Sequence, residues 1–284
     1  IDRRAERSRL PPAGARPILT RTMNERIETT RAGSLIRIWG QDLAAATIFL
    51  TRVPIPWRGP WRPGIESRSQ RAFPLIGAAI GLAGGAAYAL AACLGLPPLP
   101  SAFLAVAAQT VLTGGFHEDG LADVADSVGG RSRQHRLDIM HDSRIGSFGT
   151  LALILAIGLR VAAIASLAHP AAVAAALLAA GAESRGLVLT IIQWLAPART
   201  DGLAAAAGRP GARNAVAGLA LGLVAAALAI GPGGAFLALA AGVAGAIPVL
   251  AYARRAIGGH TGDVLGAIQQ TAEIAILLAL VARS

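Results

Sequence analysis

The chain has 284 residues, of which 54% are hydrophobic and 15% are charged, and its mean hydropathy is +0.55. A soluble domain carries about a quarter charged residues, so this charge content excludes ordinary soluble domains and favours a polytopic membrane protein. The single Cys93 excludes a disulfide framework and a multi-cysteine zinc site. The net charge of +10 does not indicate nucleic-acid binding, because the basic excess is concentrated in residues 1–71, beside the first full apolar segment.

The N-terminal region differs from the rest of the chain. Residues 1–33 are rich in Arg, contain Pro and have almost no apolar periodicity, which predicts a disordered extension ahead of a single membrane-embedded catalytic domain over 34–284. Residues 35–50 predict a helix that is too short and too polar to cross a bilayer easily, so we expect it to lie in the interface or to re-enter partway. Trp57 and Trp61 follow in a Pro-rich loop and suit the headgroup level.

Apolar segments then follow in quick succession, separated by short turns or charged loops. A transmembrane helix needs about 20 mainly apolar residues. Seven segments approach that length: Phe73–Leu96, Leu99–Phe116, Phe148–Ala168, Ala171–Ala196, Asn214–Ile230, Ala235–Ala253 and Val264–Val281. The spacing of Gly77, Gly81 and Gly85 is typical of a helix face that packs closely on a neighbour. The predicted fold is therefore all-α: a polytopic integral membrane helix bundle with about seven transmembrane helices and one interfacial or re-entrant helix.

Charge is distributed unevenly between the predicted loops. Nearly all loop charge lies at residues 51–72, 117–147, 197–213 and 254–263, whereas the alternate turns contain no Arg. The positive-inside rule places the charged loops in the cytoplasm. All four loops are therefore expected to converge on one membrane face, with the C-terminus on the other.

The stretch from residue 114 to residue 149 is the most polar part of the apolar region. It contains six of the 16 acids, namely Glu118, Asp119, Asp123, Asp126, Asp138 and Asp142. If residues 118–127 form a helix, Asp119, Asp123 and Asp126 share one face. Packed carboxylates repel one another, and a divalent cation relieves that repulsion; ligands that are all oxygen favour Mg²⁺ or Mn²⁺. The alternative is a solvated loop held by salt bridges.

The same stretch offers groups suited to phosphate, which usually accompanies Mg²⁺ in proteins. The glycine pairs at 114–115 and 129–130 allow the backbone to approach a phosphate closely. Arg144 can present a bidentate guanidinium to phosphate oxygens. The stretch therefore predicts a joint metal and phosphate site at a membrane surface.

These residues also resemble a known family. The segments GGFHEDGLADVADSVGG (114–130) and IMHDSRIGSFG (139–149) are similar to the signature of the cobalamin synthases, the adenosylcobinamide-GDP ribazoletransferases. Further similar blocks are FLTRVPIP (49–56), RAFPLIG (71–77), PARTDGL (197–203) and GGHTGDVLGAIQQTAEIAILLAL (258–280). The chain departs from the family pattern at Ser127, where Gly is common, and at His141, where Arg or Lys is common.

The resemblance implies a transferase late in cobalamin synthesis, in the cytoplasmic (inner) membrane of a bacterium with its active site facing the cytoplasm. Adenosylcobinamide-GDP and α-ribazole, or α-ribazole 5′-phosphate, would give adenosylcobalamin, or its 5′-phosphate, and GMP. Mg²⁺ is the expected cofactor, and its expected ligands are Glu118, Asp119, Asp123 and Asp126. One of these acids is a candidate base, and His117 is another, with a plain hydrogen-bonded histidine as the alternative.

A second set of polar residues is expected to bind substrate and its phosphates. It comprises Gly114, Gly115, Asp142, Ser143, Arg144, Arg185, His260 and Asp263. Arg185 lies within a predicted span, where charges are costly and usually functional or paired. A structural pair of Arg160 with Glu183 is the alternative arrangement for these intramembrane charges. For the residues at 260–263, the alternative role is helix capping and interhelical hydrogen bonding.

Two other classes of protein share part of this pattern. A CDP-alcohol phosphotransferase of lipid synthesis uses similar Asp-rich chemistry, but EDGLADVAD does not match its DxxDGxxAR…GxxxDxxxD pattern. A transporter should have polar groups near the midplane of repeated halves, whereas here they crowd one loop. The expected partners are the two substrates and membrane lipid, without nucleic acid, and a homo-oligomer is compatible with the sequence.

Overall fold

The structure, a computed structural model, describes residues 35–57, 61 and 63–283. Contacts divide the chain into two units, with the boundary after Gln41. Residues on both sides of that boundary, 35–41 and 42–50, are helical as predicted. The extension predicted over 1–33 lies outside the described residues.

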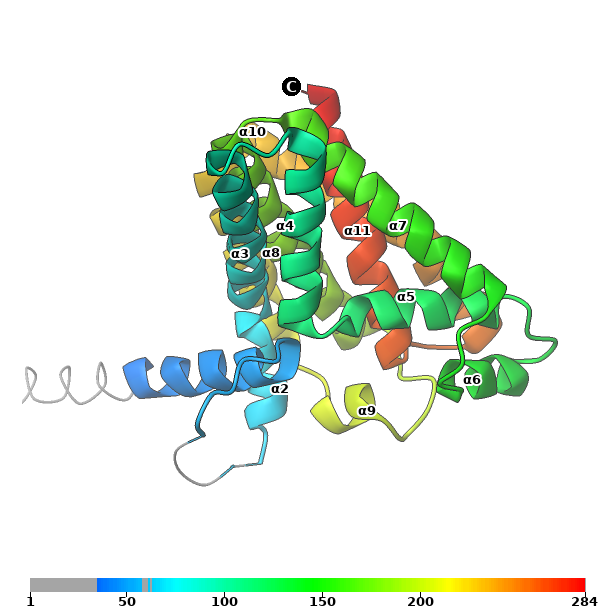
Figure 1. The fold of residues 1–284 in the computed structure, drawn as a ribbon. Helices are drawn as coiled ribbons and strands as arrows, with labels where there is room; N and C mark the ends of the chain where they lie inside the picture. Colours follow the sequence, from blue (N-terminus) through cyan, green and yellow to red (C-terminus); the bar gives the residue numbers. More distant parts are fainter. Residues whose placement is uncertain (1–34, 58–60, 62, 284) are drawn as a thin grey trace, which may run out of the picture. The chain divides into compact units, whose positions relative to one another are not determined.

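The second unit is built from helices (Figure 1). In chain order they are α2 (Ile65–Ser69), the 3₁₀ helix η1 (Gln70–Ala72), α3 (Phe73–Cys93), α4 (Pro98–Thr113), α5 (Phe116–Ser127), α6 (Arg133–His141), α7 (Ser147–Leu167), α8 (Pro170–Trp194), α9 (Leu203–Ala207), α10 (Ala212–Tyr252), the π-helix η2 (Ala253–Ile257) and α11 (Gly262–Arg283). The described residues form no β-strand, only an isolated bridge between Pro197 and His260. The predicted all-α class is therefore confirmed.

Five helical segments are long and apolar enough to cross a membrane: α3 together with the short helices before it, α7, α8, α10 together with η2, and α11. The pair α4 and α5 gives a sixth if it is one broken span, since the two helices are bent by 91°. These segments confirm an integral membrane protein, while the predicted count of seven is approximate. The counts differ because α4 has only 16 residues and because α10 is one segment despite an internal break.

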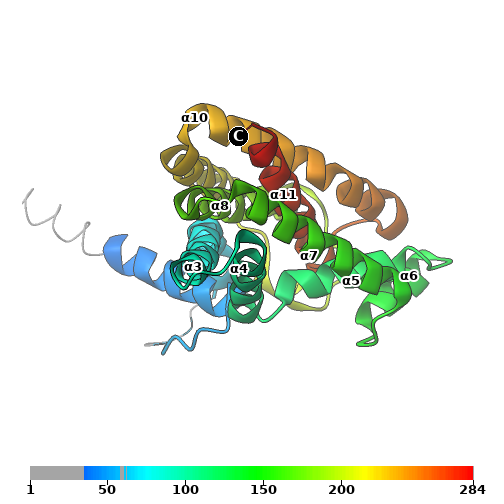
Figure 2. The ribbon, with the colours of Figure 1, turned by 45° about the horizontal axis from the view of Figure 1, so that its top comes forward.

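The break in α10 lies at Gly231, whose φ of 77° and ψ of 159° interrupt the helix. Before the break α10 packs on α8, where Gly218 faces Leu189. After the break it packs on α11, where Gly245 faces Thr271 (Figure 2). The two parts match the two spans predicted on either side of this turn.

A glycine-lined contact joins α3 to α8. A Cβ at Gly77 would lie 2.1 Å from the carbonyl O of Gly181, and one at Gly81 would lie 2.1 Å from that of Leu177. No side chain fits such a gap, so the two backbones touch directly and gain dispersion contacts along the interface. The close-packing face predicted from the glycine spacing is confirmed.

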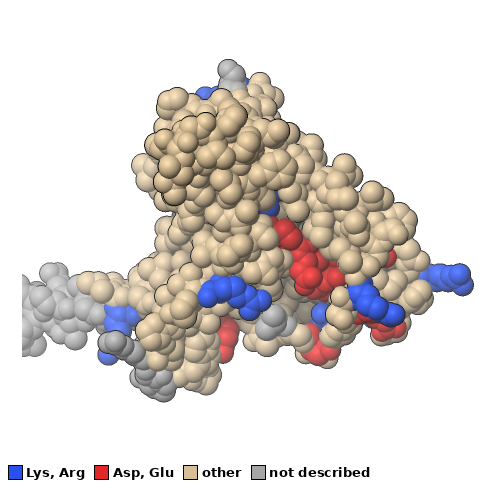
Figure 3. Space-filling model, viewed as in Figure 1, with Lys and Arg blue, Asp and Glu red and all other residues tan. Residues whose placement is uncertain are grey.

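The four charged loops meet at one end of the helices. The Gln70 amide donates to the carbonyl O of Ala207 at 3.1 Å, and Arg133 donates to that of Ile257 at 2.7 Å and to that of Ala198. These bonds join residues of all four loops, so their predicted convergence is confirmed. Figure 3 shows charged side chains at this end, with acidic residues in a recess, below a surface almost free of charge.

Candidate active site

The site begins at the corner between α4 and α5. Gly114 and Gly115 both have a φ of 70°, in the left-handed region that costs other residues roughly 1–2 kcal/mol. They turn the chain so that α5 leaves α4 at 91°. Because α5 is helical over Phe116–Ser127, the helix required for a shared carboxylate face is present. A phosphate contact of the two glycines stays a prediction.

The middle of α5 lies directly against the start of α11. A Cβ at Gly120 would lie 2.7 Å from the carbonyl O of Asp263, so a larger residue could not be placed there without moving one helix. This contact brings Asp119 of α5 and Asp263 of α11 to the wall of one pocket. Asp123 experiences the negative charges of both, and also that of Asp126. Carboxylates from distant parts of the chain therefore gather at one place.

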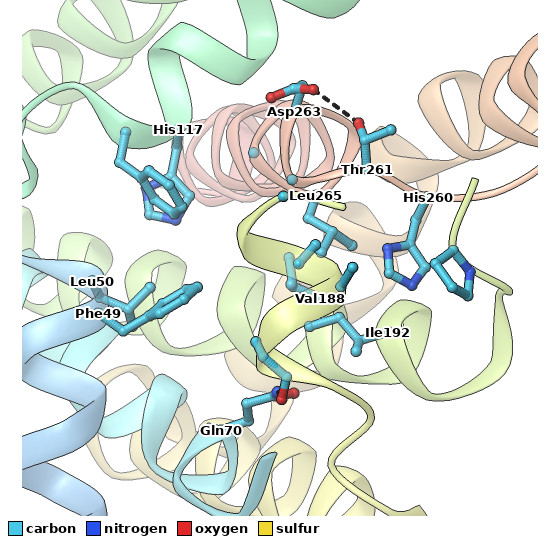
Figure 4. Close-up of a pocket in the computed structure, with 18 of the residues that line it drawn as sticks. Phe49, Leu50, Gln70, His117, Val188, Ile192, His260, Thr261, Asp263 and Leu265 are labelled. Carbon is cyan, nitrogen blue, oxygen red and sulfur yellow. Dashed lines mark hydrogen bonds between the residues drawn. The ribbon is translucent and has the colours of Figure 1, made fainter. Parts of the chain in front are cut away.

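The pocket beside these carboxylates has a volume of about 350 Å³ (Figure 4). In Figure 4, Phe49 and His117 lie on one side and His260 on the other, with Val188 and Leu265 between them. Most of the wall is apolar. The predicted site residues on the wall are His117, Asp119, Arg185, His260 and Asp263.

Two loops are joined side by side at one wall of the pocket. Ala198 N donates to the carbonyl O of His260 at 2.8 Å, and His260 N donates to that of Ala196 at 2.9 Å. The His260 side chain is buried, and its Nδ1 has no hydrogen-bond partner within the part of the chain that the structure describes. Burial lowers the pKa of this imidazole, and the charge of Arg209 lowers it too. His260 therefore presents a neutral ring at the pocket.

Thr261 caps a helix and also lines the pocket. Its Oγ1 accepts a hydrogen bond from Val264 N at 3.2 Å, in the manner of an N-cap, and donates one to Asp263 Oδ2 at 3.0 Å. Thr261 therefore has the helix-capping role that was the alternative prediction for residues 260–263. The bond from Thr261 also fixes the Asp263 carboxylate in the first turn of α11.

Arg199 and Gln70 lie on the pocket wall but are not among the predicted site residues. Arg199 Nη2 lies 3.5 Å from Asp263 Oδ2. The Gln70 Oε1 atom is buried and has no hydrogen-bond partner among the described residues. The only sequence signal for Arg199 is its place in the PARTDGL block, since a single Arg in a polar loop has no distinctive pattern. Gln70 directly precedes the RAFPLIG block and carries no signal of its own.

Glu118 and Arg185 belong to a buried network of ion pairs between helices. Arg160 of α7 lies 2.8 Å from Glu118 and 3.0 Å from Glu273, and Arg185 of α8 lies 3.4 Å from Glu273. The alternative pair of Arg160 with Glu183 is wrong, because Arg160 is paired with the other two acids. Both carboxylate oxygens of Glu183 are buried without a hydrogen-bond partner in the described chain. Glu118 does not line the pocket, and its role as a metal ligand stays a prediction.

Asp126 contacts the backbone at the start of α7. It accepts hydrogen bonds from Gly146 N at 2.7 Å and from Gly149 N at 2.8 Å. A carboxylate at this position satisfies free N–H groups and interacts favourably with the helix dipole. Both carboxylate oxygens of Asp126 therefore stabilise the start of α7, and a metal-binding role for Asp126 stays a prediction.

The loop before α7 carries a separate ion pair. Arg144 Nε lies 2.9 and 3.1 Å from the two carboxylate oxygens of Asp142; Arg144 is exposed and Asp142 is partly exposed. The hydrogen bonds from Arg144 lower the pKa of Asp142 to about 2, so the pair is charged throughout the physiological range. Asp142, Ser143 and Arg144 do not line the pocket, and their binding of phosphate stays a prediction.

The carboxylates at the pocket are the type of ligand that a hard divalent cation prefers, but they do not surround a metal ion on all sides. Among the described residues, no three His, Cys, Asp or Glu side chains are close enough together to hold a metal ion. Mg²⁺, however, keeps several waters and commonly binds through one or two carboxylates plus substrate phosphates. Asp119 lines the pocket, and Asp123 lies one turn further along α5, close enough to experience its charge. These two carboxylates meet that requirement, since neither forms a hydrogen bond or ion pair with another described residue.

The known proteins that the chain resembles all belong to one family. A family profile described as Cobalamin-5-phosphate synthase matches residues 42–281. A protein of Bradyrhizobium diazoefficiens, named adenosylcobinamide-GDP ribazoletransferase, is 44% identical over 238 residues, which cover 84% of this chain and 92% of that protein. Proteins with the same name from Azorhizobium caulinodans and Rhizobium etli are each 45% identical, over 84% and 86% of this chain and 94% and 98% of their own lengths. No solved structure matches the chain.

Proposed function

Because the chain belongs to the cobalamin-5-phosphate synthase family, we propose that it joins adenosylcobinamide-GDP to α-ribazole or α-ribazole 5′-phosphate. The products are adenosylcobalamin, or its 5′-phosphate, and GMP. The protein is a transferase of cobalamin synthesis embedded in a membrane. The observation that carries the proposed site is a mainly apolar pocket whose wall also includes Asp119, Asp263 and the side chains of Arg185 and Arg199.

The reaction needs a ribose hydroxyl to attack the phosphorus nearer the cobinamide. A new O–P bond forms, the bond to the GMP oxygen breaks, and the hydroxyl proton passes to a base. Transfers of this kind depend on positioning and on neutralising charge over the phosphoryl oxygens. Asp119 and His117 are the candidate bases, because both side chains lie on the pocket wall.

Asp119 and Asp123 would hold Mg²⁺, with Asp263 close by. When bound, the ion supplies positive charge to the phosphate oxygens and orients them. Arg185 and Arg199, both on the pocket wall, add fixed positive charge. The apolar wall around Val188 suits the benzimidazole base of α-ribazole, and the corrin macrocycle, which is larger than the pocket, would lie at the mouth.

We further propose that this end of the protein faces the cytoplasm, with membrane lipid around the apolar helices. The reason is the positive-inside rule: the four loops that converge here hold nearly all the loop Arg residues. In a bacterium, the proposed orientation corresponds to an enzyme of the inner membrane. A homo-oligomer remains a prediction.

The test is the appearance of GMP when the purified protein in detergent is mixed with adenosylcobinamide-GDP, α-ribazole 5′-phosphate and Mg²⁺. We expect stoichiometric GMP and cobalamin 5′-phosphate, and neither in the presence of a chelator. Parallel reactions with CDP-alcohols test the lipid-enzyme alternative through release of CMP. Absence of GMP with folded, purified protein would contradict the proposed substrate. Full turnover in chelator would contradict the metal.

A further inference from the structure

Arg199 is held beside Asp263 by the backbone rather than by chance contact of flexible side chains. The residue before it, Ala198, donates its N–H to His260 and accepts a hydrogen bond from Arg133. In the other loop, Thr261 Oγ1 donates a hydrogen bond to Asp263 Oδ2 at 3.0 Å and fixes that carboxylate. The two loops therefore bring one cation and one acid together at the pocket wall, although they are far apart in sequence.

Arg199 is the cation that faces the acids of the pocket. Its charge acts on Asp123 and on Asp263. The other charges acting on these two carboxylates are those of Asp119, Asp126 and, at Asp263, His141. In the absence of a ligand, the guanidinium therefore partly offsets the repulsion within a mainly negative cluster.

The bonding of Arg199 is incomplete. Its Nη2 lies 3.5 Å from Asp263 Oδ2, longer than the 2.7–2.9 Å usual for a charged N–H···O bond. Its Nη1 is buried and has no hydrogen-bond partner among the described residues. The other Arg on the wall, Arg185, makes two contacts, with Glu273 at 3.4 Å and with the carbonyl O of Gly181 at 3.1 Å, although its Nε also lacks a hydrogen-bond partner among the described residues. Arg199 therefore has donors left for a ligand, in a geometry that suits phosphate oxygens.

We propose that Arg199 exchanges partners during binding. In the free enzyme it neutralises Asp263; when a divalent cation binds the pocket acids, the guanidinium is released and binds the diphosphate of the substrate. The inference rests on the proposed function and assigns the phosphate contact to Arg199. A metal ion at Asp119 and Asp123 and the guanidinium of Arg199 are thus attracted by the same cluster of acids, so each weakens the binding of the other until the diphosphate is present.

This exchange predicts opposite changes in two affinities when the charge is removed. In Arg199→Gln, Mn²⁺ should bind the full-length protein in detergent more tightly than in wild type, on the order of fivefold, because a competing cation is gone. The measurement is Mn²⁺ binding by electron paramagnetic resonance with no substrate present. The matched control is Arg255→Gln, which removes the same charge from an exposed residue outside the pocket wall and should leave Mn²⁺ affinity unchanged.

In the same variant, the KM for adenosylcobinamide-GDP should rise about 10- to 100-fold, the range expected for losing a hydrogen bond between charged groups. Arg199→Lys keeps the charge but not the planar fork, so it should keep wild-type Mn²⁺ affinity and raise KM by a smaller factor. A residue with only a structural role would weaken both affinities or neither. Unchanged or weaker Mn²⁺ binding in Arg199→Gln, or an unchanged KM, would overturn the exchange.

The two measurements also separate this proposal from the proposed function. If wild-type protein releases no GMP, the assigned reaction is wrong, whatever Mn²⁺ does. If wild type turns over normally and Arg199→Gln behaves as wild type in both assays, the reaction stands and the role of Arg199 falls. Retention of the wild-type unfolding temperature by Arg199→Lys identifies folded protein for the comparison.

Discussion

Two groups of charged residues lie close together in this protein and are organised in opposite ways. In the buried network around Arg160, cations and acids pair at 2.8, 3.0 and 3.4 Å. Around the pocket, Asp119 on the wall and Asp123 beside it on α5 form no ion pair within the described chain, and Arg199 contacts Asp263 at 3.5 Å. A balanced set of buried charges connects helices, whereas an excess of negative charge is left for a ligand to neutralise.

The contrast is sharpest between Glu118 and Asp119, which are adjacent in sequence. Consecutive residues on an α-helix point about 100° apart. Glu118 therefore reaches Arg160 between the helices, while Asp119 lines the pocket. Adjacent carboxylates of one motif thus have different surroundings, and the motif as a whole should not be assigned a single role.

The largest expected effect comes from breaking the buried network. Arg160→Gln leaves Glu118 and Glu273 buried without their main cation, and should lower the free energy of unfolding by about 3–5 kcal/mol. Thermal unfolding of the purified protein in detergent would measure the change. Adding Glu118→Gln to the same chain should recover part of the loss, because one unpaired acid is removed. A wild-type unfolding temperature in Arg160→Gln would mean that the network does not stabilise the fold.

The next effect concerns catalysis without loss of stability. Asp123→Asn keeps the size of the side chain and removes a charge that is repelled by Asp119, Asp126 and Asp263. Turnover should fall roughly a hundredfold, the loss of about 3 kcal/mol of transition-state stabilisation, and stability in chelator should be unchanged or higher. Turnover measured against Mg²⁺ concentration gives the first quantity. Near-wild-type turnover with an unchanged Mg²⁺ requirement would remove Asp123 from the metal site.

The smallest effect separates Asp126 from the other acids of α5. Asp126→Asn replaces one of the two oxygens that accept backbone bonds from Gly146 and Gly149, and should lower the free energy of unfolding by about 1–2 kcal/mol. Turnover at a temperature where the variant is folded should fall far less than for Asp123→Asn. The opposite pattern, with stability kept and turnover lost a hundredfold, would make Asp126 a metal ligand rather than a helix cap.

Much of the fold follows from local properties of the chain. Hydropathy indicated the membrane class and the positions of the long helices, because burial in a bilayer requires apolar side chains over about 20 consecutive residues. The spacing of Gly77 and Gly81 indicated a close contact, although not that α8 would be the partner. Hydropathy did not fix the span count, because a 16-residue helix and a helix broken at Gly231 fall between the categories that a hydropathy pattern distinguishes.

The sequence by itself determined that a helix rich in acids lies at one end of a membrane bundle, since helical spacing depends only on neighbouring residues. Only the tertiary structure decided how each acid is used. Glu118 is paired because Arg160 of α7 packs opposite it, and Asp119 shares the pocket wall with Asp263 because Gly120 lets α5 approach the start of α11. The place of Arg199 beside Asp263 depends on hydrogen bonds between two distant loops. Such pairings are set by which segments pack together, and no local pattern in the chain records them.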